Sequence, residues 1–168
     1  HKGMELVTNT ALACRDIGIP ILTIFAFSTE NWKRSQDEVQ GLMNLIIKFY
    51  KKEINRIKKN RIKVLHSGVL DDLPDRVITT ISRLTEETRH HEGHVLNIAL
   101  NYGGRQEIIQ GIKQFLTDRE EQENHQVALS EESFSQYLFH PELPDPDLII
   151  RTSGEQRISN FLLWQAAY

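Results

Sequence analysis

The chain has 168 residues, of which 39% are hydrophobic and 26% are charged, and its formal net charge is -3. These values are typical of one globular domain with a sizeable core, here residues 1–168, and they exclude a disordered or membrane-embedded chain. The negative net charge gives no support for nucleic acid as a partner, and the single cysteine, Cys14, fits a reducing, cytoplasmic location without an internal disulfide.

Apolar residues recur at helical spacing near the start of the chain. This spacing predicts a helix over residues 6–17, and Gly18 is placed to end it. The continuous apolar run over residues 19–27 predicts a strand buried on both faces, as in a parallel sheet. A long helix is expected over residues 36–59, followed by a second strand over residues 62–68.

The same alternation continues in the rest of the chain. Pro74 suits the first position of a helix, and a third strand is expected over residues 94–101. The next helix, 104–117, carries apolar side chains that are expected to point inward: Ile108, Ile109, Ile112 and Phe115. Residues 146–153 and 161–165 are predicted to be the last two strands. Helices alternating with apolar strands predict an α/β fold with a mainly parallel sheet flanked by helices.

Three polar clusters lie where predicted strands end, at the edge of the sheet where α/β proteins bind ligands. STENWKR (28–34) follows the first strand, NYGGR (101–105) the third and RTSGEQRIS (151–159) the fourth. Together they carry four arginines: Arg34, Arg105, Arg151 and Arg157. Guanidinium groups that converge repel one another unless an anion joins them, and their paired donors match phosphate oxygens. The clusters therefore predict a site for a highly charged phosphate ligand or for two diphosphates.

Simpler interpretations remain open for single residues. Arg34 alone fits a solvated surface residue, and Ser35 with Glu38 has the spacing of a capping box that begins a helix. Gly103 and Gly104 fit an ordinary turn between a strand and a helix. The sequence contains neither glycine-rich loop for nucleotide phosphates and no cysteine or histidine cluster for zinc. The recurrence of arginine after three strands favours the phosphate site.

Three segments resemble signature segments of the cis-prenyltransferases, of which undecaprenyl diphosphate synthase is the best-known member: FSTENWKR (27–34), NYGGRQEI (101–108) and DLIIRTSGEQRISNFLLWQAAY (147–168). They occur in the family's order, and the resemblance extends over residues 1–168. It implies the cis-prenyltransferase fold and the condensation of isopentenyl diphosphate with an allylic diphosphate such as farnesyl diphosphate. The implied product is a cis-polyprenyl diphosphate, a precursor of the lipid carrier for cell-wall glycan synthesis.

The resemblance also implies roles for individual residues. The reaction centre is expected to be lined by Ser28, Glu30 and Asn31, with Trp32 in a mobile flap. The allylic diphosphate is expected to contact His1 and Arg34. Isopentenyl diphosphate is expected to be held by Arg151, Arg157 and Ser159. Further substrate contacts are expected from Glu38, Asn101 and Arg105.

A growing apolar product needs a dry tunnel. The apolar faces of helix 36–59 and of the helix after Pro74 are placed to form one against the sheet. Ala26 is expected to help set product length, because side chains alternate along a strand and this small residue faces away from Phe25 and Phe27. The alternative is that Ala26 only lets a helix pack closely on the sheet.

Mg²⁺ is the cofactor that the resemblance implies, since it stabilises a departing diphosphate. In the family, the Asp and Glu that position this metal lie outside the segments matched here, so no metal ligand is expected within the chain. The chain therefore resembles the middle part of a longer enzyme, and we expect these 168 residues alone to turn over substrate slowly or not at all. The resemblance also implies a homodimer and peripheral contact with a membrane.

Two other functions remain open. A non-catalytic partner subunit would keep the fold, but such relatives usually lose the FSTENW loop, which this chain retains. The second open function is an enzyme that couples prenyl units head to middle. It remains open because residues 66–68 are HSG where many family members have Ile-Gly-Asp. A DGNGR segment upstream of His1 would decide between the enzyme and the partner subunit.

Overall fold

The computed structural model describes residues 2–121 and 128–167, so His1, expected beside the allylic diphosphate, lies outside the described residues. The chain divides into two compact units, His1–Asn101 and Tyr102–Tyr168. None of the described helices is long and apolar enough to cross a membrane. The single prenyltransferase domain expected from the resemblance stays a prediction.

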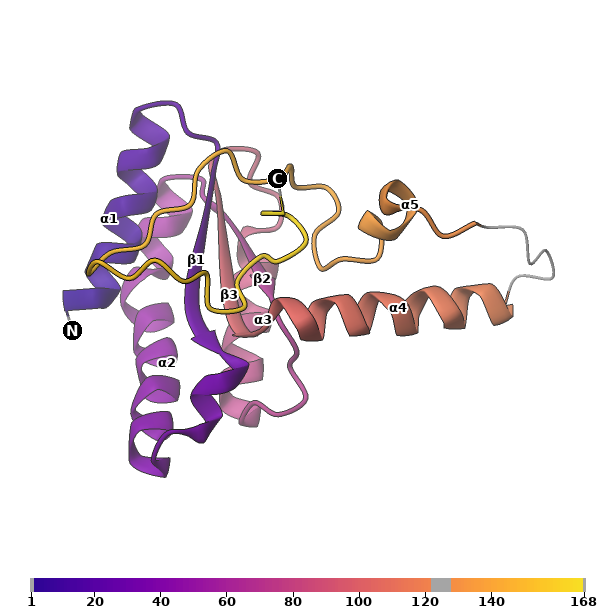
Figure 1. Ribbon diagram of the computed structural model, residues 1–168. Helices are drawn as coiled ribbons and strands as arrows, with labels where there is room; N and C mark the ends of the chain where they lie inside the picture. Colours follow the sequence, from indigo (N-terminus) through magenta and orange to yellow (C-terminus); the bar gives the residue numbers. More distant parts are fainter. Residues whose placement is uncertain (1, 122–127, 168) are drawn as a thin grey trace. The chain divides into compact units, whose positions relative to one another are not determined.

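The first unit is built on a three-stranded sheet in the order β1-β3-β2, and Figure 1 shows β3 between its two neighbours. The strands are β1 (Ile21–Ser28), β2 (Lys63–Ser67) and β3 (Val95–Tyr102). β2 and β3 pair in parallel, with Lys63 opposite Val95. The Val95 N–H donates to Pro20 O at 2.9 Å, so β1 and β3 also begin at the same edge. The parallel sheet expected from the sequence is confirmed.

Helices precede and connect these strands: α1 (Lys2–Asp16), the 3₁₀ helix η1 (Thr29–Lys33), α2 (Gln36–Lys59) and α3 (Asp75–Thr88). α2 has the predicted bounds, because Ser35 and Glu38 close the capping box at its start. The placement of Pro74 inside α3 is wrong by one position. Its ψ of 139° is extended, so it is the N-cap, and its carbonyl accepts the Val77 N–H at 2.7 Å.

Apolar side chains of α1, α2 and α3 pack on one face of the sheet in two clusters. The first comprises Ala11, Phe49, Ile54, Ile57, Ile62, Val64, Leu84 and Leu96. The second comprises Phe27, Met43, Leu73, Val77, Ile81 and Leu100. Burial of these side chains fixes α2 and α3 against the sheet, so the space between them is lined by hydrocarbon.

The second unit contains α4 (Gly104–Glu121) and α5 (Glu131–Ser135). The inward orientation predicted for α4 holds for Phe115, which is 4% exposed, but is wrong for Ile109 and Ile112, which are 53% and 36% exposed. The buried face of α4 is the one that carries Gly111 and Phe115, and a side chain at Gly111 would meet the Phe134 ring of α5. Residues spaced by three or four share a helix face, so Ile109 lies on another face, whereas Ile112, three residues before Phe115, lies at the edge of the buried face.

The last two predicted strands, residues 146–153 and 161–165, are not formed. Leu148 and Ile150 are 73% and 78% exposed, and no described strand pairs with this segment. A β-rich sequence becomes a strand only where a neighbour takes up its N–H and C=O groups. The chain turns instead through residues with positive φ: Ser153, Gly154, Ser159, Asn160 and Leu162. The RTSGEQRIS cluster therefore lies in a loop.

Candidate active site

The polar loop that follows β1 is closed by Asn31. The Ser28 N–H donates to Asn31 Oδ1 at 3.0 Å, across the first turn of η1. At the other end of the turn, the Arg34 N–H donates to Asn31 O at 3.1 Å, and Arg34 itself is exposed. Asn31 thus holds the backbone of Ser28 and Arg34, two of the residues expected to contact substrate, in a defined geometry.

Trp32 ties this loop to the end of β3. Its indole Nε1–H donates to Asn101 Oδ1 at 2.7 Å, and Asn101 Nδ2 donates to Val69 O at 2.8 Å. Asn101 is buried at 1% exposure and has a φ of 51°, a left-handed conformation that Asn tolerates better than most residues. The Trp32 ring also packs edge-on against Phe27, with 5.1 Å between ring centroids. Trp32 and Asn101 therefore form one polar bracket at the carboxyl edge of the sheet.

The two glutamates near this loop have different surroundings. Glu38 Oε2 accepts from the Ser35 hydroxyl at 3.1 Å and from the Ser35 N–H at 3.3 Å, so the capping interpretation of Glu38 is confirmed. Glu30 lies exposed in the first turn of η1. Contact of either carboxylate with substrate stays a prediction.

An apolar cavity of about 210 Å³ lies between the sheet and helices α2 and α3. Fourteen of its seventeen lining residues are apolar, so its wall suits a hydrocarbon. It extends along the strands from Phe27, at the end of β1, to Val64, at the start of β2. An apolar cavity of about 150 Å³ holds benzene, so there is room here for at least one prenyl unit. The apolar faces of α2 and α3 thus enclose a cavity against the sheet in the first unit, and its use as a product tunnel stays a prediction.

Ala26 lies in the wall of the cavity, as expected for a residue that borders a tunnel. Phe27 also borders it, contrary to strict alternation of side chains, because β1 ends at Ser28 and the chain turns there into η1. The presence of Ala26 in the wall supports its predicted influence on product length, which stays a prediction.

The HSG segment, at which this sequence departs from many cis-prenyltransferases, shapes the opposite wall. His66 lines the cavity, and its Nε2–H donates to Leu100 O at 2.9 Å. Gly68 has a φ of 138°, and a Cβ there would lie 2.0 Å from Leu100 O. Only glycine fits this close approach, so the fold requires glycine at position 68, which the sequence alone did not indicate.

In the second unit, Arg151 and Ser159 are brought together. Arg151 Nη1 donates to Ser159 Oγ at 2.6 Å and also to the Arg157 carbonyl. The Arg157 side chain points elsewhere and pairs with Glu155, Nε to Oε2 at 3.1 Å. The loop thus already groups two of its three expected isopentenyl diphosphate ligands, while Arg157 is exposed and held by a surface carboxylate.

The start of α4 is joined to the residue after Ser159. Gly104 N–H donates to Asn160 O at 2.7 Å, and Arg105 N–H donates to Asn160 Oδ1 at 2.9 Å. A Cβ on Gly104 would lie 2.8 Å from Leu163 Cγ, so the glycine permits a close approach of two chain segments. Asn160 was not predicted to belong to the site. Its φ is 60°, a left-handed backbone conformation that asparagine tolerates better than most residues.

Glu107 is a second residue missed by the sequence analysis. It is 3% exposed and accepts hydrogen bonds from Tyr102 Oη (2.5 Å), Phe139 N (3.2 Å) and Gln165 Nε2 (3.2 Å). Burial and the nearby Glu107 carboxylate raise the pKa of Tyr102, so its hydroxyl stays a donor. In the sequence, Glu107 has the position of an ordinary acidic residue in a first helical turn, which hides this role.

Among residues 2–121 and 128–167, no group of three His, Cys, Asp or Glu side chains is arranged to hold a metal ion. The site residues fall in both units: Ala26, Ser28, Glu30, Asn31, Trp32, Arg34, Glu38 and Asn101 in the first, and Arg105, Arg151, Arg157 and Ser159 in the second. Within each unit the contacts above join several of them. Their convergence on one ligand stays a prediction.

Residues 1–168 match the family described as "Putative undecaprenyl diphosphate synthase". The chain is 45% identical to an isoprenyl transferase of Clostridium perfringens, 48% to that of Fusobacterium nucleatum and 44% to that of Thermotoga maritima. In each comparison the whole chain is aligned, and it covers 66%, 67% and 71% of the relative. The chain thus spans about two thirds of the length of these curated relatives.

Two solved structures are similar. A probable undecaprenyl diphosphate synthase from Campylobacter jejuni has a TM-score of 0.85 and 35% identity over 96% of this chain and 75% of that one. A lavandulyl diphosphate synthase from Lavandula x intermedia, solved with dimethylallyl diphosphate, has a TM-score of 0.91 and 29% identity over 97% of this chain and 71% of that one. The match over every residue and the identity with isoprenyl transferases show that this chain belongs to the undecaprenyl diphosphate synthase family of prenyltransferases.

Proposed function

We propose that the protein condenses isopentenyl diphosphate with an allylic diphosphate and lengthens the product by cis-prenyl units. The observation that carries this proposal is the apolar cavity that begins beside the polar loop after β1. A prenyl diphosphate has the same division, a charged head and a hydrocarbon tail. The lining residue Phe27 is followed directly by Ser28, so the change from apolar to polar surface falls within one residue of the chain.

The residues around the head group have separate tasks. Arg34 binds the allylic diphosphate, and Arg151 with Ser159 binds isopentenyl diphosphate, because guanidinium and hydroxyl donors suit phosphate oxygens. Asn31 and the Trp32–Asn101 bracket fix the loop that faces the reacting carbons. Donors held in place before the reaction stabilise developing charge without reorganisation.

The proposed reaction is a condensation with loss of diphosphate. The bond between the allylic carbon and its diphosphate breaks, and the double bond of isopentenyl diphosphate attacks the cationic carbon. Loss of a proton from the adjacent carbon leaves a cis double bond, and diphosphate is released. The longer tail then occupies the apolar cavity between the sheet, α2 and α3.

Mg²⁺ is the cofactor that we expect for the departure of diphosphate. The described residues offer no cluster of ligands for it, so none of the steps above is assigned to a metal-bound group. A homodimer, an allylic substrate such as farnesyl diphosphate and a cell-wall lipid product belong to the same proposal. Retention of the Ser28–Arg34 loop argues against a non-catalytic partner subunit.

The test uses the protein that carries this chain, with labelled isopentenyl diphosphate, farnesyl diphosphate and Mg²⁺. Arg34→Ala should lower kcat/KM for the allylic substrate about 10²–10³-fold, the usual cost of one lost preorganised donor. Lys33→Ala removes an adjacent exposed cation and is the matched control, which should change little. Arg151→Ala should instead raise KM for isopentenyl diphosphate. Equal, small effects of Arg34→Ala and Lys33→Ala would refute the assignment of Arg34.

A further inference from the structure

Among the described residues of the sheet, only His66 lines the apolar cavity with a polar side chain. The other two polar lining residues, Thr80 and Thr85, belong to α3, and their hydroxyls donate to main-chain carbonyls one turn earlier in that helix. On β2, His66 stands opposite Ile98 of β3, an apolar lining residue. An imidazole offers a hydrocarbon tail a poorer contact than an aliphatic side chain does, so its hydrogen bond is the feature that distinguishes His66.

This hydrogen bond ends next to the Trp32–Asn101 bracket. His66 Nε2–H donates to Leu100 O at 2.9 Å, and Leu100 directly precedes Asn101. From the same side, Val69 N–H donates to Asn101 O at 3.2 Å, and Asn101 Nδ2 donates to Val69 O at 2.8 Å. Three hydrogen bonds between β2, the loop that follows it and the end of β3 thus fix the backbone on which the bracket is built.

The backbone of Asn101 depends on such contacts because its φ of 51° is left-handed. Sparsely populated backbone conformations persist where the surrounding contacts fix them. A rotation of this backbone would turn the Asn101 side chain, whose Oδ1 accepts the Trp32 Nε1–H at 2.7 Å. Of the three supporting hydrogen bonds, the one from His66 has a donor that lines the cavity. The bracket is therefore supported from the wall of the cavity.

A prenyl tail in the cavity would change the surroundings of this hydrogen bond. His66 is half-buried, so water competes for its Nε2–H while no tail covers the ring. A hydrocarbon against the ring excludes that water and leaves the ring less room to turn, and both effects favour the bond to Leu100 O. The strengthened support passes to Asn101 and from there to Trp32 through hydrogen-bonded neighbours.

We propose that His66 is a positioning residue for the loop after β1. It holds the Leu100–Asn101 segment so that Asn101 accepts the Trp32 indole, and a prenyl tail beside His66 strengthens this hold. Closure of the loop then depends on the tail of the substrate as well as on its diphosphate head. Such a coupling is reciprocal, so a closed loop also favours a tail in the cavity. The effect of the tail rests on the proposed function, whereas the positioning itself does not.

The experiment measures hydrogen exchange of the Trp32 indole N–H by NMR in the full-length protein, with Trp32→Phe to identify the signal. His66→Leu keeps an apolar wall but removes the donor, and it should raise the exchange rate about fivefold, the factor that corresponds to one net hydrogen bond. His66→Gln keeps an N–H near the position of Nε2 and should stay close to the wild-type rate. The Trp164 indole, which donates to Ser135 Oγ at 3.1 Å in the second unit, is the internal reference and should not change.

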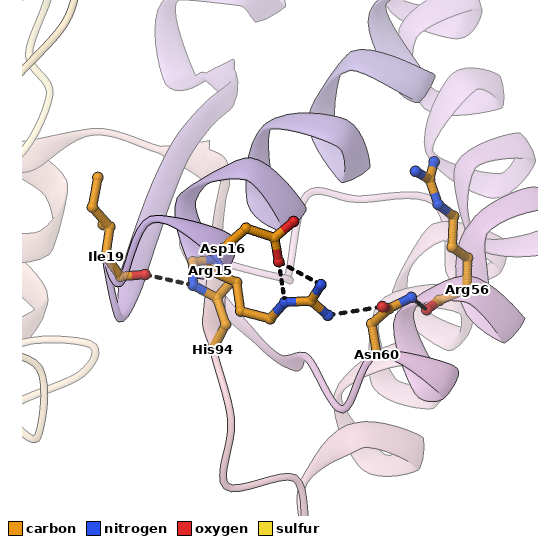
Figure 2. Close-up of polar contacts among 6 residues, drawn as sticks. All are labelled: Arg15, Asp16, Ile19, Arg56, Asn60 and His94. Carbon is orange, nitrogen blue, oxygen red and sulfur yellow. Dashed lines mark hydrogen bonds and ion pairs between the residues drawn. The ribbon is translucent and has the colours of Figure 1, made fainter.

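His94 offers a matched control at the amino end of β3. Its Nδ1–H donates to Ile19 O at 2.9 Å, and Figure 2 shows this bond together with the one from Arg15 Nη1 to Asn60 Oδ1. None of the six residues drawn there lines the cavity. His94→Leu therefore removes a histidine bond to a main-chain carbonyl without changing the cavity wall, and Trp32 exchange should stay at the wild-type rate.

The effect of the tail is tested with two probes. Inorganic diphosphate has the head alone, and farnesyl thiodiphosphate adds the tail, with sulfur in place of the bridging oxygen so that the diphosphate does not leave. In the wild type, the thiodiphosphate should slow Trp32 exchange more than inorganic diphosphate does. In His66→Leu this extra slowing should be smaller, by up to about fivefold, because the bond that the tail strengthens is missing.

Each claim has its own refuting result. The positioning is overturned by unchanged Trp32 exchange in His66→Leu, by an equal acceleration at Trp164 or in His94→Leu, or by a His66→Gln rate as high as that of His66→Leu. Equal extra slowing by the tail in the wild type and in His66→Leu would overturn the coupling to the tail. Failure of farnesyl thiodiphosphate to bind would refute the proposed function and leave the positioning of Asn101 by His66 intact.

Discussion

Replacement of Ala26 by Leu should shorten the products while leaving the first condensation fast. Ala26 lies in the wall of the apolar cavity, with Ile24 before it on β1 and Phe27 after it. A larger side chain at this position reaches into the space that the growing tail would fill. It lies close to the polar loop but does not carry a group that binds diphosphate, so the chemistry of the first step should persist.

The size of the effect follows from volumes. A cavity of about 150 Å³ holds the six carbons of benzene, which is about 25 Å³ for each carbon. Leu adds three carbons to Ala, so it removes about 75 Å³, roughly a third, from a cavity of about 210 Å³. That loss is comparable to most of one prenyl unit. Elongation should therefore stop at least one unit earlier than in the wild type.

The assay resolves labelled products by chain length and measures melting temperature on the same samples. Ala13→Leu, the same change at an exposed position of α1, is the matched control and should leave the products unaltered. If Ala26 only allowed close helix packing, Leu would overpack the core at a cost of about 1–3 kcal/mol in the free energy of unfolding. An unchanged distribution of products with a lowered melting temperature would thus refute the assignment of Ala26 to the tunnel.

Three further predictions concern stability. Burial lowers the pKa of His94. The stability that the neutral ring contributes is therefore complete above the ordinary pKa of about 6.5 and is lost as the pH falls toward the lowered pKa. In the His94→Asn variant, the melting temperature should fall less steeply as the pH is lowered. Trp32→Phe leaves Asn101 Oδ1 without its donor and should lower the free energy of unfolding by about 1–3 kcal/mol in urea titrations, whereas an unchanged midpoint would contradict the bracket. Glu107→Gln removes a buried charge that accepts three donors; it should cost about 2 kcal/mol and bring the pKa of Tyr102 back toward its ordinary value, which ultraviolet titration measures.

The sequence predicted the first unit well because its signals are local. The capping box of Ser35 and Glu38 marks the start of α2, and apolar periodicity marks its length. Continuous apolar runs predicted β1 and β3, and β3 is largely buried. The expected burial of β1 on both faces is wrong, because β1 lies at the edge of the described sheet and its residues other than Phe27 are half-buried or exposed. Each of these elements is specified by residues within one or two turns of it, so single-sequence reasoning was sufficient.

The second unit was harder to predict because its structure depends on partners distant in the chain. Residues 146–153 have the composition of a strand, but composition does not reveal whether a neighbouring strand is present. Asn160 is bonded to Gly104 and Arg105, more than fifty positions earlier, and no local pattern signals that contact. Glu107 is hidden for the same reason, because its donors come from three separate segments.

The bracket between Trp32 and Asn101 explains why the polar loop after β1 contains a tryptophan, and it also sets how far this loop can act as a flap. Opening requires the 2.7 Å bond to Asn101 to break, which leaves a buried amide oxygen unpaired at a cost of about 1–3 kcal/mol. Since 1.4 kcal/mol is a factor of ten, loss of this bond alone limits the open loop to about 15% of molecules or fewer without ligand. The Ser28–Asn31 bond lies within the loop and adds no barrier if the loop moves as a unit. Phe27 is a core residue at 1% exposure, so loss of the Trp32–Phe27 ring contact adds to the cost of opening. The loop is therefore closed most of the time, and a ligand needs only a modest preference for the closed form to hold it there.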